Sequence, residues 1–194
     1  MTDMTDHSYA ATPSSSDDLA TRWSGAVTAD EFKSVFRGHP GGVAVVTADD
    51  GTGPVALTVT SVASVSVDPP LLIFSASAYS SATPTILRAS SIVVHLLDAE
   101  DLPLAQLAST SGVDRFADTS AWTQLVTGEP VYRGVRAWIR CTVVDRIEAG
   151  GATVIAAQAV QTSIARDVES EDGGAPLVYH NRTWHQLGDH SRLD

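Results

Sequence analysis

Residues 42–84 read GVAVVTADDGTGPVALTVTSVASVSVDPPLLIFSASAYSSATP, and this stretch decides the fold more than any other part of the chain. An apolar, β-branched run at 43–47 and an alternating run at 55–60 flank a break rich in Asp, Gly and Pro. Two such runs predict a β-hairpin with one buried face. A third apolar run, at 71–74, follows two prolines and predicts a buried strand.

Two groups of Ser and Thr residues adjoin these strands, a first hydroxyl segment at 58–66 and a second hydroxyl segment at 75–83. Thr83-Pro84 predicts a helix start, with a hydroxyl at the N-cap and proline in the first turn. Because unpaired N–H groups at helix starts suit phosphate, we hypothesise a phosphate site between the two segments. Ordinary turns, in which Ser and Thr bond the local backbone, are the alternative interpretation.

The rest of the chain predicts further strands and few helices. Thr28 and Glu31 form a capping box that starts a short helix ending before Pro40. Strands are expected at 92–97, 137–148, 152–163, 177–180 and 183–187, and short helices at 84–89 and 98–107. Residues 109–130 lack periodicity and predict an irregular excursion. We therefore expect a mainly β protein, an antiparallel barrel with short decorating helices.

Length and composition indicate one domain with a polar tail. Residues 1–24 of the 194 are rich in Ser, Thr and Asp, so we expect a disordered tail there and the domain at 25–190. The formal net charge of −11 argues against binding to nucleic acid or anionic membranes, which need basic surfaces. The chain starts without the pattern of a secretory signal and has no stretch long enough to span a bilayer. With a single cysteine, Cys141, we expect a cytoplasmic protein.

Several familiar kinds of site have no support in this sequence. It has no dinucleotide glycine fingerprint, P-loop, Gly-x-Ser-x-Gly elbow or zinc-type cysteine pattern. His180, His185 and His190 are spaced five apart, but a spacing of five along a strand puts His180 and His185 on opposite faces. We therefore expect no metal site. Cys141 lies in a strand-like run, and we interpret it as a packing residue.

The order of residues 58–71, TVTSVASVSVDPPL, closely resembles the flavin-binding signature of the flavin reductase family. That family is a branch of the FMN-binding split barrels, and its members supply reduced flavin to two-component monooxygenases. The resemblance covers roughly residues 28–188. It includes His39-Pro40-Gly41-Gly42, Asp114-Arg115-Phe116, Gly128-Glu129-Pro130, Ala137-Trp138 and Pro176-Leu177-Val178-Tyr179-His180. It implies an antiparallel split β-barrel.

The resemblance also implies which residues bind the flavin. Both hydroxyl segments would contact it, the first along its ring edge and both at its phosphate. Arg115 would pair with the phosphate and Phe116 would stack on a ring. The cofactor-binding residues implied are Thr58, Val59, Thr60, Ser61, Ser64, Val65, Ser66, Ser77, Ser80, Ser81, Thr83, Arg115, Phe116, Tyr179 and His180, and His180 is the one catalytic candidate. A surface ion pair of Arg115 with Asp114 or Asp118, and packing roles for Tyr179 and His180, are the alternatives.

One departure from the family pattern concerns the nicotinamide. Many relatives carry Gly-Asp-His-Thr in the second long hairpin, with the His beside the nicotinamide-binding face. This chain has Gly150-Gly151-Ala152-Thr153 there and so lacks the imidazole. Because hydride transfer is the cofactors' own chemistry, the change bears more on nicotinamide use than on flavin binding.

The resulting prediction is an NAD(P)H-dependent flavin reductase that supplies reduced FMN or FAD to a separate monooxygenase by diffusion. The resemblance also implies a homodimer with flavin near the interface. Two alternatives stay open: a flavin-binding protein with little nicotinamide-dependent turnover, and an oxidoreductase acting on another substrate. The sequence does not choose between FMN and FAD, or between NADH and NADPH.

Overall fold

The computed structural model describes residues 27–165 and 174–193. The chain divides into two compact units, 1–36 and 37–194. The predicted tail, 1–24, and most of the acidic segment 165–174 lie outside the described residues. Helix α2 (Ala29–Arg37) begins at the predicted capping box, in which the Glu31 N–H donates to the Thr28 Oγ1 and the Thr28 N–H donates to the Glu31 carboxylate.

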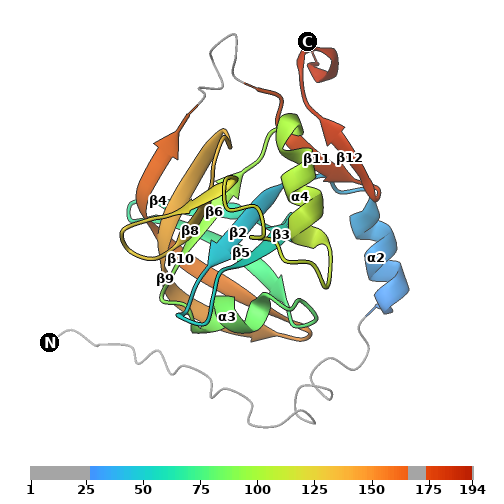
Figure 1. The fold of residues 1–194 in the computed structure, drawn as a ribbon. Helices are drawn as coiled ribbons and strands as arrows, with labels where there is room; N and C mark the ends of the chain where they lie inside the picture. Colours follow the sequence, from blue (N-terminus) through green and yellow to red (C-terminus); the bar gives the residue numbers. More distant parts are fainter. Residues whose placement is uncertain (1–26, 166–173, 194) are drawn as a thin grey trace, which may run out of the picture. The chain divides into compact units, whose positions relative to one another are not determined.

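The second unit is built on a seven-stranded antiparallel sheet with strand order β3-β2-β6-β9-β10-β5-β4 (Figure 1). Its strands are β2 (Ala44–Ala48), β3 (Val55–Val59), β4 (Ala63–Val67), β5 (Pro70–Ser77), β6 (Ser91–Leu96), β9 (Ala137–Ala149) and β10 (Ala152–Ile164). The edge strands β3 and β4 are consecutive in the sequence, so the sheet curls until its two edges approach without pairing. This arrangement confirms the predicted antiparallel split barrel.

Smaller elements decorate the barrel. One sheet joins β1 (Gly41–Gly42), β11 (Leu177–His180) and β12 (Thr183–Gln186), and another joins β7 (Trp122–Gln124) and β8 (Pro130–Tyr132). Helix α3 (Thr83–Arg88) follows β5, and α4 (Leu102–Ser109) follows the 3-10 turn η1 (Ala99–Asp101). A second 3-10 turn, η2 (Asp189–Ser191), follows β12. The excursion at 109–130 is irregular as predicted, apart from β7.

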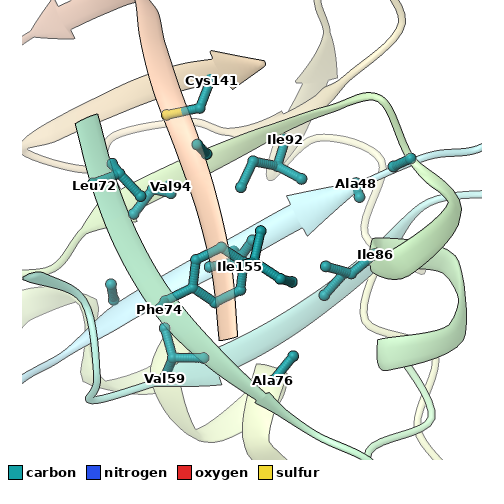
Figure 2. Close-up of a cluster of buried hydrophobic side chains, with 14 of the residues drawn as sticks. Ala48, Val59, Leu72, Phe74, Ala76, Ile86, Ile92, Val94, Cys141 and Ile155 are labelled. Atoms are coloured by element: carbon teal, nitrogen blue, oxygen red, sulfur yellow. The ribbon is translucent and has the colours of Figure 1, made fainter. Parts of the chain in front are cut away.

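The barrel interior is filled by aliphatic side chains around Phe74 and Ile155, which lie side by side near the middle of the close-up in Figure 2. These two residues are partners in the β5–β10 pairing, and their inward direction follows from the period of two along each strand. Cys141 is buried in the same cluster, and burial raises the pKa of its thiol to about 12. A thiol held so fully protonated is a packing group, as the sequence suggested.

Two local predictions are wrong. Ala82 is the N-cap of α3, and the Thr83 hydroxyl instead donates 2.6 Å to the Ser77 carbonyl. The rings of His180 and His185 lie 5.6 Å apart, because the turn at 181–182 folds β12 back on β11. His180 pairs with Thr183, so His185 is its diagonal neighbour on the same face. Alternation of faces holds within one strand, whereas His180 and His185 lie on two strands joined by a turn.

Candidate functional site

The two hydroxyl segments are connected through β5. The Ser75 N–H donates to the Ser61 Oγ at 2.9 Å, which ties the turn after β3 to the last part of β5. The Ser61 Oγ lies 3.5 Å from the Ser75 carbonyl oxygen, a distance too long for a good O–H···O hydrogen bond. The first segment is therefore held next to the second, and the Ser61 hydroxyl keeps capacity to donate to a ligand.

The second hydroxyl segment is a tight turn made by its own side chains. The Ser77 Oγ accepts from the Tyr79 N–H at 3.3 Å, and the Ser80 Oγ accepts from the Ala82 N–H at 3.3 Å. A serine oxygen that accepts a backbone bond still has its hydrogen to donate. Thr83 differs, because it is buried and its hydrogen is used on the Ser77 carbonyl. Ser77, Ser80 and Ser81 are thus the donors of this turn, and Thr83 shapes it.

Arg115 reaches the second hydroxyl segment from the irregular excursion. Its Nη1 donates to the Ser81 Oγ at 3.4 Å and its Nη2 donates to the Thr110 carbonyl at 2.8 Å. Its Nε is buried with no hydrogen-bond partner among the described residues. The described residues show no ion pair of Arg115 with Asp114, whose carboxylate accepts from the Phe116 N–H, or with Asp118. A guanidinium beside a ring of hydroxyl donors is suited to a phosphate.

An aromatic cluster fixes the backbone that carries Arg115. Phe116 is only 7% exposed, stacks on Tyr132 with ring centroids 5.2 Å apart, and meets Trp122 edge-on at 5.1 Å. The Tyr132 hydroxyl donates to the Arg115 carbonyl at 2.8 Å, and burial raises the Tyr132 pKa, so that hydroxyl stays protonated. The Trp122 Nε1 donates to the Phe116 carbonyl at 3.1 Å. Phe116 therefore helps to position Arg115 through its packing on Tyr132 and Trp122.

Two ionisable groups, His95 and Glu129, are also buried in this part of the chain. His95 is fully buried, with its Nδ1 3.0 Å from the Val45 carbonyl and its Nε2 accepting from the Tyr132 N–H at 3.1 Å. Burial lowers the His95 pKa from 6.5 to about 4, so the ring is neutral with its hydrogen on Nδ1. Burial alone would raise the pKa of Glu129, but bonds from Ser91, Thr127 and Arg140 outweigh it and lower that pKa.

The end of β3 is packed against the C-terminal hairpin through a glycine. A Cβ at Gly41 would lie 2.8 Å from the Thr60 carbonyl oxygen, so only glycine allows this approach. Gly41 is in turn the antiparallel partner of Tyr179, whose ring packs on Trp184 with centroids 4.7 Å apart. Tyr179 and His180 therefore belong to the sheet that adjoins Thr60. Among the described residues, no hydrogen bond or ring contact joins either of them to the Ser81–Arg115 pair.

The first hydroxyl segment presents backbone more than side chains. The Thr58 hydroxyl donates to the Ala105 carbonyl at 2.7 Å, and Val59 is buried in the barrel core. Ser64, Val65 and Ser66 lie on β4, which pairs only with β5 among the described strands. One edge of β4 thus offers peptide N–H and C=O groups, which suits recognition of a flat ring edge.

Ala152 lies beside the second hydroxyl segment, because it is the antiparallel partner of Ser77 at the start of β10. Ser75, Thr110 and Gly41 were not among the predicted cofactor-binding residues, although each holds one of those residues in place. The first two act through backbone groups, which leave no trace in the sequence. The Gly41-Gly42 pair was a signal for close approach.

The donor set fits a flavin: hydroxyls and a guanidinium for its phosphate, and an open strand edge for its ring. Within 27–165 and 174–193, no group of three or more His, Cys, Asp or Glu side chains is placed to hold a metal ion. In that same part of the chain, no helix is long and apolar enough to cross a membrane.

Comparison with known proteins identifies the family to which this chain is similar. Residues 36–188 match the family described as flavin reductase like domain. The NADH:FMN oxidoreductase of Rhodococcus qingshengii is 39% identical over 177 residues, which cover 91% of this chain and 87% of that protein. The crystal structure of a flavin reductase domain protein from Arthrobacter sp. FB24 superposes with a TM-score of 0.77 at 29% identity, covering 86% of this chain and 98% of the other. BorF, the flavin reductase component of a bacterial two-component tryptophan halogenase, superposes with a TM-score of 0.71 at 26% identity, covering 84% and 99%.

Proposed function

The chain belongs to the flavin reductase family, and on that premise we propose that it is an NAD(P)H-dependent flavin reductase supplying reduced FMN or FAD to a separate monooxygenase. The main observation behind the proposal is the hydrogen bond from Arg115 to Ser81, in a turn whose serine hydroxyls can donate to a phosphate. The closely related Rhodococcus protein is named an NADH:FMN oxidoreductase, which supports the same substrates here.

In the proposed site each residue has a physical role. Ser61, Ser77, Ser80 and Ser81 donate hydrogen bonds to the flavin phosphate, and Arg115 supplies the positive charge. The open edge of β4, with Ser64, Val65 and Ser66, orients the ring by backbone bonds. Thr60, Tyr179 and His180 border it through Gly41. When bound, the flavin accepts a hydride from the nicotinamide, and the protein holds the two rings together.

A second candidate function is flavin binding with little nicotinamide-dependent turnover. Ala152 favours it, because the position beside Ser77 carries only a methyl group. His180 is the candidate that the sequence offers to replace the missing imidazole, and its ring packs beside the ring of His185. The first function is preferred because ring orientation does not require an imidazole.

The reduced flavin is proposed to leave by diffusion to the monooxygenase. BorF is the reductase component of a two-component system, which supports a separate oxygenase. The net charge of −11 provides no basic docking patch for an acidic partner. Both proteins would act in the cytoplasm.

The working form is proposed to be a homodimer. Apolar residues run across one sheet face: Ile147 opposite Val154, and Ile73 opposite both Ala156 and Ala63. Ile147 is exposed, and Ala63 is the first residue of β4 and lies within the first hydroxyl segment. An exposed apolar surface of this kind marks a partner surface, and a second copy would close one side of the flavin site.

The reductase function is tested by anaerobic mixing of the protein with NADH or NADPH and a large excess of free FMN or FAD. The expected result is reduction of all the free flavin over many turnovers. Reduction of no more than one flavin per protein would contradict delivery and indicate a self-contained oxidoreductase. Flavin binding without any reduction would establish the second candidate instead.

The dimer is tested by light scattering with flavin bound. Ile147→Glu places a charge on the apolar face and is expected to give monomers with weaker flavin binding. Val126→Glu is the matched control, because Val126 is fully exposed in the loop between β7 and β8. A wild-type monomer at micromolar concentration would contradict the proposal.

A further inference from the structure

Tyr79 is the most exposed aromatic side chain among the described residues, at 94%. Its backbone is nevertheless fixed. The Tyr79 N–H donates to the Ser77 Oγ at 3.3 Å, and the Ala78 N–H donates to the Gly151 carbonyl at 3.0 Å. A turn tied down on both sides therefore holds a large ring out in water, where it contributes little to the core.

The neighbouring turn leaves that ring uncovered. A Cβ at Gly151 would lie 3.8 Å from the Tyr79 ring, so the ring stands beside a residue that has no side chain. The next residue, Ala152, adds only a methyl group. Since Tyr79 is almost wholly exposed, its faces are open to a flat group on a ligand.

The backbone of Tyr79 belongs to the turn that forms the proposed phosphate site. Ser77 and Ser80 flank Tyr79 along the turn, and Ser81 is the residue that Arg115 contacts. Hydrogen-bond donors for a phosphate beside an open aromatic ring match the two chemical parts of a nucleotide, its phosphate and its base. Any base can stack on a tyrosine ring, because every base has a flat π-face. FMN ends at its phosphate, whereas the dinucleotides FAD and NAD(P)H also carry an adenine.

We propose that Tyr79 stacks on the adenine of a dinucleotide and so makes the site favour dinucleotides over mononucleotides. The inference rests on the proposed function, because it takes the phosphate site as given. The adenine belongs either to NAD(P)H or to FAD. Both share the same stacking chemistry, and the test separates them.

The test compares Tyr79→Ala, Tyr79→Phe and wild type. For flavins, dissociation constants of FMN and FAD are measured. For nicotinamides, KM and kcat are measured with NADH and with reduced nicotinamide mononucleotide, which lacks adenine. In Tyr79→Ala the adenine loses its stacking partner, so binding of the dinucleotide is expected to weaken about tenfold. The mononucleotides are expected to be unchanged, and Tyr79→Phe is expected to behave as wild type because the ring remains.

A rise in KM for NADH alone assigns the adenine to the nicotinamide dinucleotide, and weaker binding of FAD alone assigns it to the flavin. Either result supports the inference. Equal losses for mononucleotides and dinucleotides, or no loss at all, would overturn it. If the inference fails in this way but the wild-type protein still reduces free FMN, the proposed reductase function is not contradicted. Val126→Ala controls for removal of an exposed apolar side chain elsewhere.

Discussion

Arg115 donates a hydrogen bond to the Ser81 hydroxyl at 3.4 Å across 34 positions of sequence, and this contact brings the irregular excursion to the turn that follows β5. The Arg115 side chain is half-buried, and its backbone is held by Tyr132. A guanidinium immobilised in this way costs less entropy to order around a phosphate than one on a free surface side chain.

Ser81→Ala and Arg115→Ala are expected to weaken FMN without weakening riboflavin, which lacks the phosphate. A hydrogen bond to a charged group contributes roughly 1.5–3 kcal/mol, so each change is expected to cost about ten- to a hundredfold in FMN affinity. Titration of each variant with both ligands measures the difference. Equal losses for FMN and riboflavin would mean that these residues do not contact the phosphate.

Ser61→Ala is the informative contrast. The Ser61 Oγ accepts the Ser75 N–H, so its removal also leaves a backbone donor of β5 without its partner. Both ligands are expected to weaken in this variant, together with a loss of about 1 kcal/mol in unfolding free energy.

Gly41→Ala is expected to displace Thr60, at the edge of the proposed flavin site. The new Cβ would lie 2.8 Å from the Thr60 carbonyl oxygen, so β1 or the end of β3 must move. Overpacking of this kind costs about 1–3 kcal/mol, and flavin affinity is expected to fall with it. Gly42→Ala is the matched control, because nothing lies within 4 Å of its Cβ position. Denaturant unfolding and flavin titration of both variants measure the effect, and equal behaviour would contradict the close approach.

The strands were predictable because their period of two is written in the residues: β2, β3, β9, β10, β11 and β12 all appear where alternation or apolar runs indicated them. The hydroxyl segments were located by their Ser and Thr content and by the resemblance of residues 58–71 to the family signature. Their mutual placement was not predictable, because the Ser61–Ser75 and Ser81–Arg115 bonds depend on how β5 and the excursion meet in space. The Thr83 cap failed because a hydroxyl near a turn has several local acceptors, and sequence does not rank them.

His95 is expected to make stability depend on pH. Its pKa is 6.5 without burial and about 4 in the folded protein, so between these values the unfolded protein binds more protons. Stability therefore falls as pH falls through this window, by about 1 kcal/mol between pH 7 and 5.5. Unfolding of wild type and His95→Asn by urea at both pH values isolates the contribution. The variant is expected to lose less stability on acidification, and parallel losses would contradict a neutral buried ring.

Ala152→His tests whether the missing imidazole limits turnover. Ala152 is half-buried and pairs with Ser77, so a His there would stand at the edge of the phosphate-binding turn, beside Tyr79 and Gly151. If the imidazole helps to place the nicotinamide, the variant is expected to raise the rate of flavin reduction while leaving flavin affinity nearly unchanged. That split marks a group that acts on the nicotinamide or in the transition state, because ground-state flavin binding stays as it was. Stopped-flow reduction under anaerobic conditions measures the rate, and flavin titration measures the affinity. Ala152→Gln, of similar size but without an ionisable ring, controls for bulk at the turn. Unchanged reduction in Ala152→His would mean that this barrel orients the nicotinamide through other residues, with Tyr79 and His180 the next to vary.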